Sequence, residues 1–294
     1  MAADPATNPR ITVVTPSFNQ AAYIEATILS VLGQRYPNLE YFVYDGGSTD
    51  GSVEIIKRYA PELAGWVSQK DEGQSDAINR AFERSTGDIL CWLNSDDLHW
   101  PHTLREVARS LAGRIDQPIV ISGGCIIFHE NENRGGILAP APHDPERLKR
   151  CDYVVQPSTF WTRAAWNQVG KLDQSQHYAF DWDWFLRAVP ICRFETVPAI
   201  LSSYRIHSQH KSSGGENKRR LEIEGVLGRM GQVEHLALYR WLARREDLWP
   251  SLSRFGHLRR SGFPVFAALG FAPRLWTVAA RHRMDDVVDA FNML

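Results

Sequence analysis

The stretch that decides the fold of this chain is a short apolar run followed at once by two adjacent acids. It reads Asp88-Ile89-Leu90-Cys91-Trp92-Leu93-Asn94-Ser95-Asp96-Asp97. The run is typical of a buried strand, and we expect a helix to start at Trp100-Pro101. A strand in an open α/β sheet carries such residues to the rim where these folds bind ligands. Paired carboxylates there suit Mg²⁺ or Mn²⁺, but Asp96 as a helix cap and Asp97 as a solvated acid explain the four residues 94–97 equally well.

Strand and helix patterns alternate around that run over residues 10–112. Strands are predicted at 11–15, 39–44 and 66–68. The first should stop at Pro16, which cannot donate to a central ladder, and Ser75 can cap a helix. The alternation predicts a mostly parallel sheet with helices on both faces. Polar or turn residues follow four strand ends, at 16–19, 45–50, 71–76 and 94–97, so we expect these segments to share one edge.

The pattern changes over residues 113–213. Strands are predicted at 119–123 and 126–129 around a Gly-Gly-Cys turn, and at 194–197 and 200–205 as a pair separated by Pro198. Asp181 and Asp183 lie one residue apart among aromatics. An aspartate at a helix start near an apolar pocket can act as a general base with a raised pKa. An N-cap at Asp181 and an exposed Asp183 explain the same pattern equally well.

Composition limits the class of protein. The chain has 294 residues, 44% of them hydrophobic and 23% charged, with a net charge of -1. These values are ordinary for a globular enzyme and provide no global attraction to nucleic acid. The four cysteines form no Cys-x-x-Cys pair, and three of them lie beside apolar or strand-like residues. We therefore expect those three to be buried free thiols in a reducing, cytoplasmic compartment. Residues 1–10 do not resemble a signal peptide, and no apolar run approaches the ~20 residues of a membrane span.

Taken together, these clusters resemble the family 2 glycosyltransferases, which have the GT-A fold. The matching pieces are 15–19, 45–50, 71–81, 87–90, Asn94-Ser95-Asp96-Asp97, Gln156-Pro157-Ser158, Asp181-Trp182-Asp183 and Tyr204-Arg205-Ile206-His207. The order and spacing of the pieces carry the resemblance, which spans roughly residues 10–213. It implies a GT-A catalytic domain at 10–213, with a nucleotide-binding half (10–112) and an acceptor-binding half (113–213). A small antiparallel acceptor-side sheet would accompany the main one. We expect a disordered N-terminus at 1–9 and a helical C-terminal region at 214–294.

The resemblance also assigns site residues. Pro16, Phe18 and Asp45 would line the nucleotide-base pocket, with Asp45 facing the base. Asp71 and Asp76 would border the base, ribose or sugar, and Asp96 would meet the ribose or sugar. Asp97 and His207 would hold Mn²⁺ or Mg²⁺, and Asp181 would be the general base. Two departures from the family pattern matter: Phe18 stands where tyrosine is common, and Phe180-Asp181 where Glu-Asp is common, so Asp183 stays open as the base.

The resemblance implies inverting, metal-dependent transfer of a sugar from a nucleotide donor, most plainly a UDP-sugar, to a glycan or lipid-linked acceptor in cell-surface polysaccharide synthesis. A nucleotidyltransferase is one alternative, but residues 16–19 lack the Gly-rich, basic phosphate loop expected there. A non-catalytic sugar-nucleotide-binding protein is the other, and the candidate base and metal residues argue against it. Recognition of nucleic acid is not expected, because nothing resembles a base-reading module.

The C-terminal region carries a basic and aromatic segment. Residues 254–283 contain six arginines and no acids, interleaved with Phe255, Phe263, Phe266, Phe271 and Trp276. Such a segment suits peripheral contact with an anionic membrane at the inner face of the plasma membrane. Packing of the aromatics within a helical bundle, on the catalytic domain or in a homodimer is the competing interpretation.

Overall fold

The computed structural model describes residues 8–130, 134–209, 211, 216–260, 264–270 and 272–294. Most of the N-terminal segment expected to be disordered, together with Phe263 and Phe271, lies outside these residues. The chain divides into two compact units, which we call the sheet unit and the helical unit. The sheet unit comprises residues up to 143 and 154–215, and the helical unit comprises 144–153 and 216–294.

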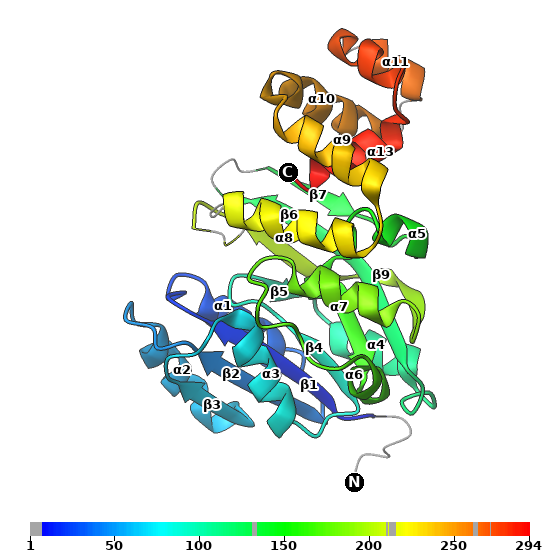
Figure 1. The fold of residues 1–294 in the computed structure, drawn as a ribbon. Helices are drawn as coiled ribbons and strands as arrows, with labels where there is room; N and C mark the ends of the chain where they lie inside the picture. Colours follow the sequence, from blue (N-terminus) through cyan, green and yellow to red (C-terminus); the bar gives the residue numbers. More distant parts are fainter. Residues whose placement is uncertain (1–7, 131–133, 210, 212–215, 261–263, 271) are drawn as a thin grey trace. The chain divides into compact units, whose positions relative to one another are not determined.

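The sheet unit contains a nine-stranded sheet within the described residues (Figure 1). Its parallel half follows the order β3 (Gly65–Ser68), β2 (Leu39–Asp45), β1 (Ile11–Ser17) and β4 (Ile89–Trp92). The order continues with β8 (Thr159–Thr162), β6 (Ile119–His129), β9 (Arg193–Ile206) and β5 (Leu98–His99), while β7 (Arg134–Leu138) pairs with β6. The predicted α/β class is confirmed, but the antiparallel strands extend the main sheet rather than forming a separate one.

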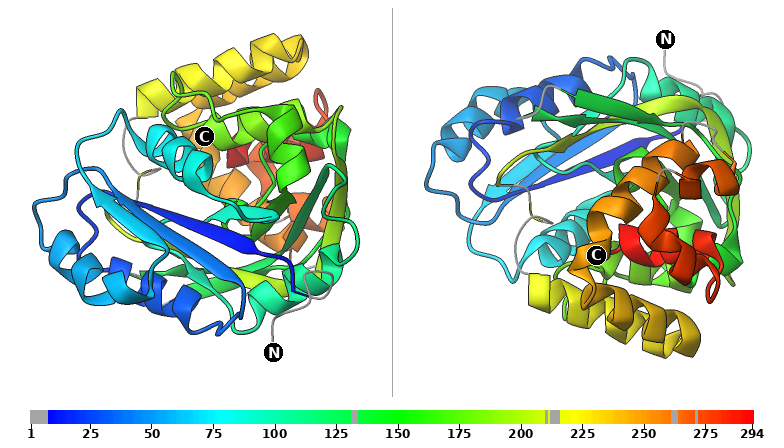
Figure 2. Two further views of the ribbon diagram at one scale, coloured as in Figure 1. Left: turned by 90° about the horizontal axis from the view of Figure 1, so that it is seen from below. Right: turned by 90° about the horizontal axis from the view of Figure 1, so that it is seen from above.

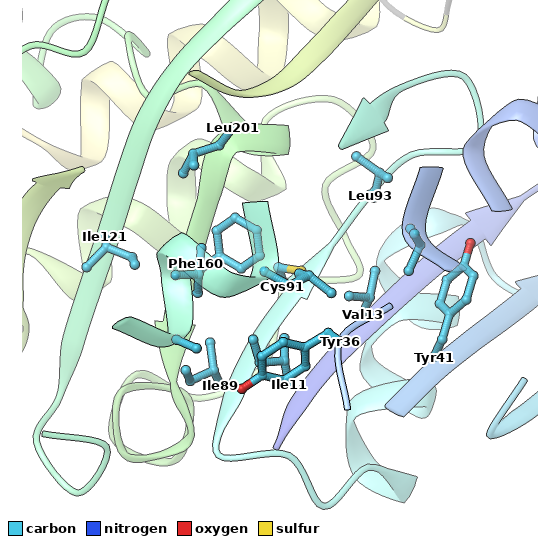
Figure 3. Packing of buried hydrophobic residues seen from close by; sticks show 14 of the residues in the cluster. Ile11, Val13, Tyr36, Tyr41, Ile89, Cys91, Leu93, Ile121, Phe160 and Leu201 are labelled. Carbon is cyan, nitrogen blue, oxygen red and sulfur yellow. The ribbon is translucent and has the colours of Figure 1, made fainter. Parts of the chain in front are cut away.

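Helices cover both faces of this sheet (Figure 2). One face packs on α1 (Ile24–Leu32), α2 (Ser52–Tyr59) and α4 (Thr103–Leu111), and the other on α3 (Gln74–Arg84), α6 (Arg163–Val169) and α7 (Phe180–Ala188). Because side chains alternate along a strand, Ile11 and Val13 enter the first core, whose packing Figure 3 shows. Trp161 enters the second core, on the other face, where the centroid of its ring lies 4.8 Å from that of Trp184. The sheet is therefore packed between two buried cores, one on each face.

Strand β1 runs one residue beyond Pro16, where the sequence predicted that it would stop. Pairing of β1 with β4 ends at Val14, while pairing with β2 continues to Ser17. The Val14 carbonyl accepts from Leu93 on the β4 side, and the Ser17 carbonyl accepts from Gly46 on the β2 side. Alternation therefore turns the nitrogen of Pro16 to the β4 side, where the ladder has already ended. The proline costs no hydrogen bond there.

Strands β6 and β9 are continuous where the sequence predicted two interrupted pairs. Their register shifts between Ser122 and Cys125, and Pro198 lies in the matching irregularity of β9. A Cβ on Gly123 would lie 2.5 Å from Leu201 Cγ, and one on Gly124 would lie 2.7 Å from Ile200 Cδ1. The Gly-Gly pair is therefore a site of close strand approach at a bulge rather than a turn.

Two predicted helix starts are also wrong. Helix α3 begins at Gln74 after Gly73, whose φ is 115°, so Ser75 lies buried inside the first turn and is no cap. Helix α4 begins at Thr103, because residues 98–99 first form β5 against β9. The Thr103 hydroxyl then donates to the Leu201 carbonyl at 2.6 Å. Asp96 is thus remote from the helix start, and its interpretation as a helix cap is excluded.

The helical unit confirms the predicted C-terminal helices and includes one element from the middle of the chain. Its members are α5 (Pro145–Leu148), α8 (Glu216–Arg229), α9 (Val233–Ala243), α10 (Trp249–Arg260), α11 (Val265–Gly270), α12 (Trp276–Ala279) and α13 (Met284–Asn292). Arg147 of α5 donates from Nε and Nη2 to the buried carboxylate of Asp289, the shortest contact being 2.8 Å. Arg150 pairs with Asp286 at 2.7 Å. Residues 144–153, which the sequence placed in the acceptor-binding half, are therefore held by α13.

We expect Arg147→Met to lower the free energy of unfolding of the helical unit by about 2–4 kcal/mol. Removing one partner of a buried pair leaves an uncompensated charge and costs about 3–5 kcal/mol, reduced here because the Arg147 side chain is 42% exposed. Urea denaturation followed by circular dichroism measures the loss. Lys149→Met is the control, since its partner Glu146 is mostly exposed. Equal stability of the two variants would contradict a structural role for the Arg147–Asp289 pair.

A buried histidine makes stability depend on pH. His99 lies against Phe160, with ring centroids 5.4 Å apart, and burial lowers its pKa to about 3. The His99 side chain of the unfolded chain is protonated below about pH 6.5, whereas that of the folded chain stays neutral down to about pH 3. The free energy of unfolding therefore falls as the pH drops from about 6.5 towards 3, by at most ~1.4 kcal/mol per pH unit. We expect His99→Gln to flatten that part of the curve in denaturation at stepped pH. The exposed neighbour His102, replaced by Asn, should leave the slope unchanged.

In the described part of the chain, no helix has the length and apolar character to span a bilayer. All four cysteines are buried, free thiols, whereas the sequence predicted this for three of them.

Candidate functional site

The four predicted strand-end clusters meet at one edge of the sheet. The Asn19 amide donates to Ser48 Oγ at 2.7 Å, and the Thr49 amide donates to Asn19 Oδ1 at 3.0 Å, so the loops after β1 and β2 are joined. Gln74 Nε2 donates to Asn94 Oδ1 at 2.7 Å and joins the start of α3 to the turn after β4. The predicted clustering at one edge is confirmed.

Asp45 organises the loop after β2. Its residue is 2% exposed, and its carboxylate accepts from the amides of Gly47 and Ser48 and from the hydroxyls of Ser48 and Ser68. Gly47 has a φ of 86°, which favours glycine in this turn. These contacts are those of a structured turn, and a contact between Asp45 and a nucleotide base stays a prediction.

The remaining predicted donor residues lie around the same edge. Phe18 is 61% exposed, whereas Pro16 is buried in β1. Asp71 accepts from the Gly73 amide, and its pKa is raised by burial, with the charges of Asp76 and Asp45 adding to the effect. Asp76 accepts from the Glu72 amide and the Gln174 side chain and pairs with Arg80 at 3.6 Å.

Asp97 is the most enclosed of the predicted site acids. It is 0% exposed, and its Oδ1 accepts from the Arg205 amide at 3.1 Å while Oδ2 accepts from Asn94 at 3.3 Å. The buried Thr27 hydroxyl contacts the Asp97 carbonyl at 2.8 Å. Burial, together with the charge of Asp96, raises the pKa of the Asp97 carboxyl well above its usual range. These are the surroundings of a side chain that braces the turn.

Asp96, rather than Asp97, lies beside His207. Asp96 Oδ2 is 3.1 Å from His207 Nε2, across a separation of 111 residues in sequence. The Gln209 amide lies 3.3 Å from His207 Nδ1. With the proton on Nε2, His207 donates to Asp96; with the proton on Nδ1, the lone pair of Nε2 and the Asp96 carboxylate can both face a cation. This differs from the expectation from the sequence, in which Asp97 and His207 hold the ion and Asp96 meets the ribose or sugar.

The Asp96–His207 pair suits a divalent cation. A carboxylate oxygen and an imidazole nitrogen are ligands that Mn²⁺ and Mg²⁺ accept, and catalytic ions keep further positions for substrate oxygens. Within the described residues, no group of three or more histidine, cysteine, aspartate or glutamate side chains is arranged to hold an ion. Two protein ligands, with the rest supplied by a bound diphosphate, fit these residues.

Helix α7 separates the roles of Asp181 and Asp183. The N-cap of α7 is Ala179, so Asp181 is not a cap but lies in the first turn, where its Oδ1 accepts from the Trp182 amide at 2.8 Å. Asp183 accepts from Arg187 Nε at 2.9 Å, and Arg187 also donates to the carbonyls of Val169 and Lys171. Asp183 thus anchors α7 to the preceding loop, and Asp181 stays the candidate base that the sequence predicts.

Contacts of the neighbouring Phe180 bring the start of α7 to the turn after β4. The centroid of the Phe180 ring lies 5.9 Å from that of Trp92 in β4. Lys211 Nζ lies 5.0 Å from the Phe180 ring and donates to Gln74 Oε1 at 2.7 Å. Gln74 in turn binds Asn94. No local pattern predicts the contact between Gln74 and Lys211, because it spans 137 residues.

Comparison with known proteins identifies the family. The sequence profile described as Glycosyl transferase family 2 matches residues 12–155. The chain belongs to glycosyltransferase family 2. Over 230 residues it is 27% identical to an uncharacterised glycosyltransferase of Mycobacterium tuberculosis, covering 76% of this chain and 84% of the relative. Over 200 residues it is 28% identical to a PGL/p-HBAD biosynthesis glycosyltransferase of the same organism, covering 67% and 73%.

Two solved structures share the fold of this family 2 enzyme. Residues 1–349 of Staphylococcus aureus TarS, in complex with UDP-GlcNAc, align with a TM-score of 0.58 at 17% identity and cover 75% of this chain and 71% of theirs. The mannosyltransferase PcManGT from Pyrobaculum calidifontis, in complex with GDP-Man and Mn²⁺, aligns with a TM-score of 0.61 at 19% identity, covering 99% and 86%. The GT-A fold expected from the sequence is confirmed, and the chain is a glycosyltransferase.

Proposed function

We propose that this glycosyltransferase carries out inverting, divalent-metal-dependent transfer of a sugar from a nucleotide-sugar donor to a glycan or lipid-linked acceptor. The observation that carries the proposal is the Asp96–His207 contact at the edge that also bears the first turn of α7 with Asp181. An ion-binding pair and a candidate base at one edge are what a direct displacement needs. The GDP-Man and Mn²⁺ bound by PcManGT add support by analogy.

The proposed division of labour follows from the contacts. Asp96 and His207 would hold Mn²⁺ or Mg²⁺, which stabilises the charge of the departing diphosphate. Asp97 keeps the turn in shape, so our proposal reverses the roles that the sequence analysis gave to the two acids. Asp181 would take the proton of the acceptor hydroxyl while the acceptor oxygen attacks the anomeric carbon and the bond to the diphosphate breaks, which inverts that centre.

Nucleotide recognition is proposed for the loops after β1, β2 and β3. The exposed ring of Phe18 would stack on the base, and Pro16 and Asp45 would shape the pocket that receives it. Asp71 and Asp76 would border the ribose or sugar. We propose UDP as the nucleotide, as in the TarS complex with UDP-GlcNAc, while PcManGT binds GDP-Man.

Binding of donor candidates tests this proposal. We expect a UDP-sugar to raise the melting temperature in the presence of Mn²⁺, because a ligand bound by the native state alone stabilises it; at a hundred times Kd the gain is about 2.7 kcal/mol. UDP-GlcNAc, UDP-glucose and GDP-mannose should be screened with Mn²⁺ and with EDTA. A stabilisation that persists unchanged in EDTA would contradict the metal dependence, and no stabilisation by any nucleotide sugar would contradict the donor class.

For the acceptor side we propose contact of the helical unit with an anionic membrane, as a lipid-linked acceptor would require. Trp276 is 47% exposed and lies at a hollow of about 720 Å³, lined also by Val265, Arg281 and Arg283. An exposed tryptophan beside arginines matches an interfacial site. Phe255, in contrast, is fully buried, as the bundle interpretation predicted.

Point variants test the membrane contact better than truncation near residue 213, because truncation would remove the partners of Arg147 and Arg150. We expect R281Q/R283Q to reduce pelleting with phosphatidylserine vesicles about tenfold or more, since each basic residue near the surface contributes ~1 kcal/mol. Arg245→Gln, in the same unit, is the control. Equal pelleting of wild type and R281Q/R283Q, or a homodimer that buries Trp276, would contradict the proposal.

A further inference from the structure

Arg205 and three side chains around it, those of Tyr23, Phe128 and Glu130, form a cluster that we call the Arg205 clamp. The guanidinium carbon of Arg205 lies 5.0 Å from the ring centroid of Tyr23 and 4.8 Å from that of Phe128. Glu130 links Arg205 to Tyr23: its Oε1 accepts from Arg205 Nη1 at 3.4 Å, and its Oε2 accepts from the Tyr23 hydroxyl at 3.0 Å. The Arg205 side chain is only 14% exposed.

Distant parts of the chain build this clamp. Phe128 and Arg205 are register partners on the parallel strands β6 and β9, which puts their side chains on the same face. Glu130 follows the end of β6, and Tyr23 immediately precedes α1. The hydrogen bond from Tyr23 to Glu130 spans 107 residues. No local pattern in the sequence joins these residues, so a positioning role for them follows only from the structure.

The clamp holds the residues around the proposed ion site. Arg205 Nε donates to the Asp96 carbonyl at 3.0 Å, and the Arg205 amide donates to Asp97 Oδ1 at 3.1 Å. On the other side, the Tyr23 ring lies against His207, with centroids 4.2 Å apart. The Arg205 clamp therefore restrains both the backbone of Asp96 and the ring plane of His207.

We propose that Tyr23, Phe128, Glu130 and Arg205 are positioning residues that set the Asp96–His207 pair for a divalent cation. The inference rests on the proposed function of that pair. It assigns Arg205 a role other than binding the diphosphate, because the rings of Tyr23 and Phe128 lie over its guanidinium and Nε and Nη1 already have acceptors. Residues that orient metal ligands typically change metal affinity about 10–100-fold when replaced.

Arg205→Lys tests the clamp while keeping the positive charge. Lysine lacks the planar group that can stack between two rings while donating to two acceptors. We expect the Kd of Mn²⁺ for the enzyme–nucleotide complex, measured by electron paramagnetic resonance of free Mn²⁺ with UDP or GDP, to rise about tenfold. The Kd of the same nucleotide in EDTA, measured by calorimetry, should stay within about twofold.

Arg114→Lys is the matched control. Arg114 pairs with Glu195 near the start of β9, at the opposite end of the strand from Arg205, and is also part-buried. Its substitution should leave both constants unchanged. Tyr23→Phe removes the hydroxyl bond to Glu130 but keeps the ring on His207, so we expect an intermediate loss of Mn²⁺ affinity of about threefold and near-normal folding.

The outcomes separate the clamp from the function on which it rests. If wild type binds neither UDP nor GDP with Mn²⁺, the proposed function fails. If wild type binds Mn²⁺ with nucleotide and Arg205→Lys binds it equally well, the clamp fails alone. A parallel loss of Mn²⁺ affinity, nucleotide affinity in EDTA and melting temperature in both Arg205→Lys and Tyr23→Phe would mark general structural support and also overturn the proposal.

Discussion

Asp181→Asn is expected to lower kcat for sugar transfer about 10³-fold while leaving the Kd of the Mn²⁺–nucleotide-sugar complex within about twofold. Asparagine has nearly the shape of aspartate and can still accept from the Trp182 amide, as Asp181 does at 2.8 Å. It cannot take a proton from the acceptor hydroxyl. Loss of transfer without loss of donor binding is the signature of a missing general base.

The control for this variant is Asp183→Asn. Asp183 faces Arg187, so its substitution should weaken the anchoring of α7 and lower the melting temperature, with a far smaller effect on kcat. Initial rates with the donor identified by thermal shift, and calorimetry with the same donor, provide both readouts. Full transfer by Asp181→Asn combined with an inactive, stably folded Asp183→Asn would move the base to Asp183.

Asp96→Asn is expected to reduce metal-dependent kcat/KM about 10²–10³-fold and to weaken Mn²⁺ binding by at least tenfold. The substitution removes the carboxylate that lies 3.1 Å from His207 and leaves a weaker amide oxygen for the ion. Hydrogen bonds to the backbone of residue 96 are unaffected, so the melting temperature without metal should change little.

Asp97→Asn separates the two acids. It replaces a fully buried carboxyl whose two oxygens accept from Asn94 and from the Arg205 amide, and asparagine has only one oxygen to offer these donors. We expect a lower melting temperature, with a loss of about 1–3 kcal/mol, and a smaller effect on Mn²⁺ affinity than in Asp96→Asn. If Asp97→Asn loses Mn²⁺ binding and Asp96→Asn retains it, the roles are those first predicted from the sequence.

Some parts of the fold follow from local pattern because their cause is local. The apolar run 89–92, the β-branched run 11–15 and the polar residues after each strand predicted a parallel sheet with a site at one edge. The errors concern places where a distant segment changes a local preference. Gly123 and Gly124 look like a turn until Leu201 and Ile200 approach them in β9.

What the sequence alone determined is the class of protein: an α/β sheet, a polar edge and a set of motifs that place the chain in glycosyltransferase family 2. What only the tertiary structure decided is which partners the residues of each acidic pair meet, and from these partners we infer their roles. The Asp97 carboxyl accepts from the amide of Arg205, 108 residues away, whereas the Asp96 carboxylate lies beside His207. Asp183 accepts from Arg187. The sequence cannot distinguish two aspartates that lie one or two positions apart, because their burial and their partners come from segments that meet only on folding.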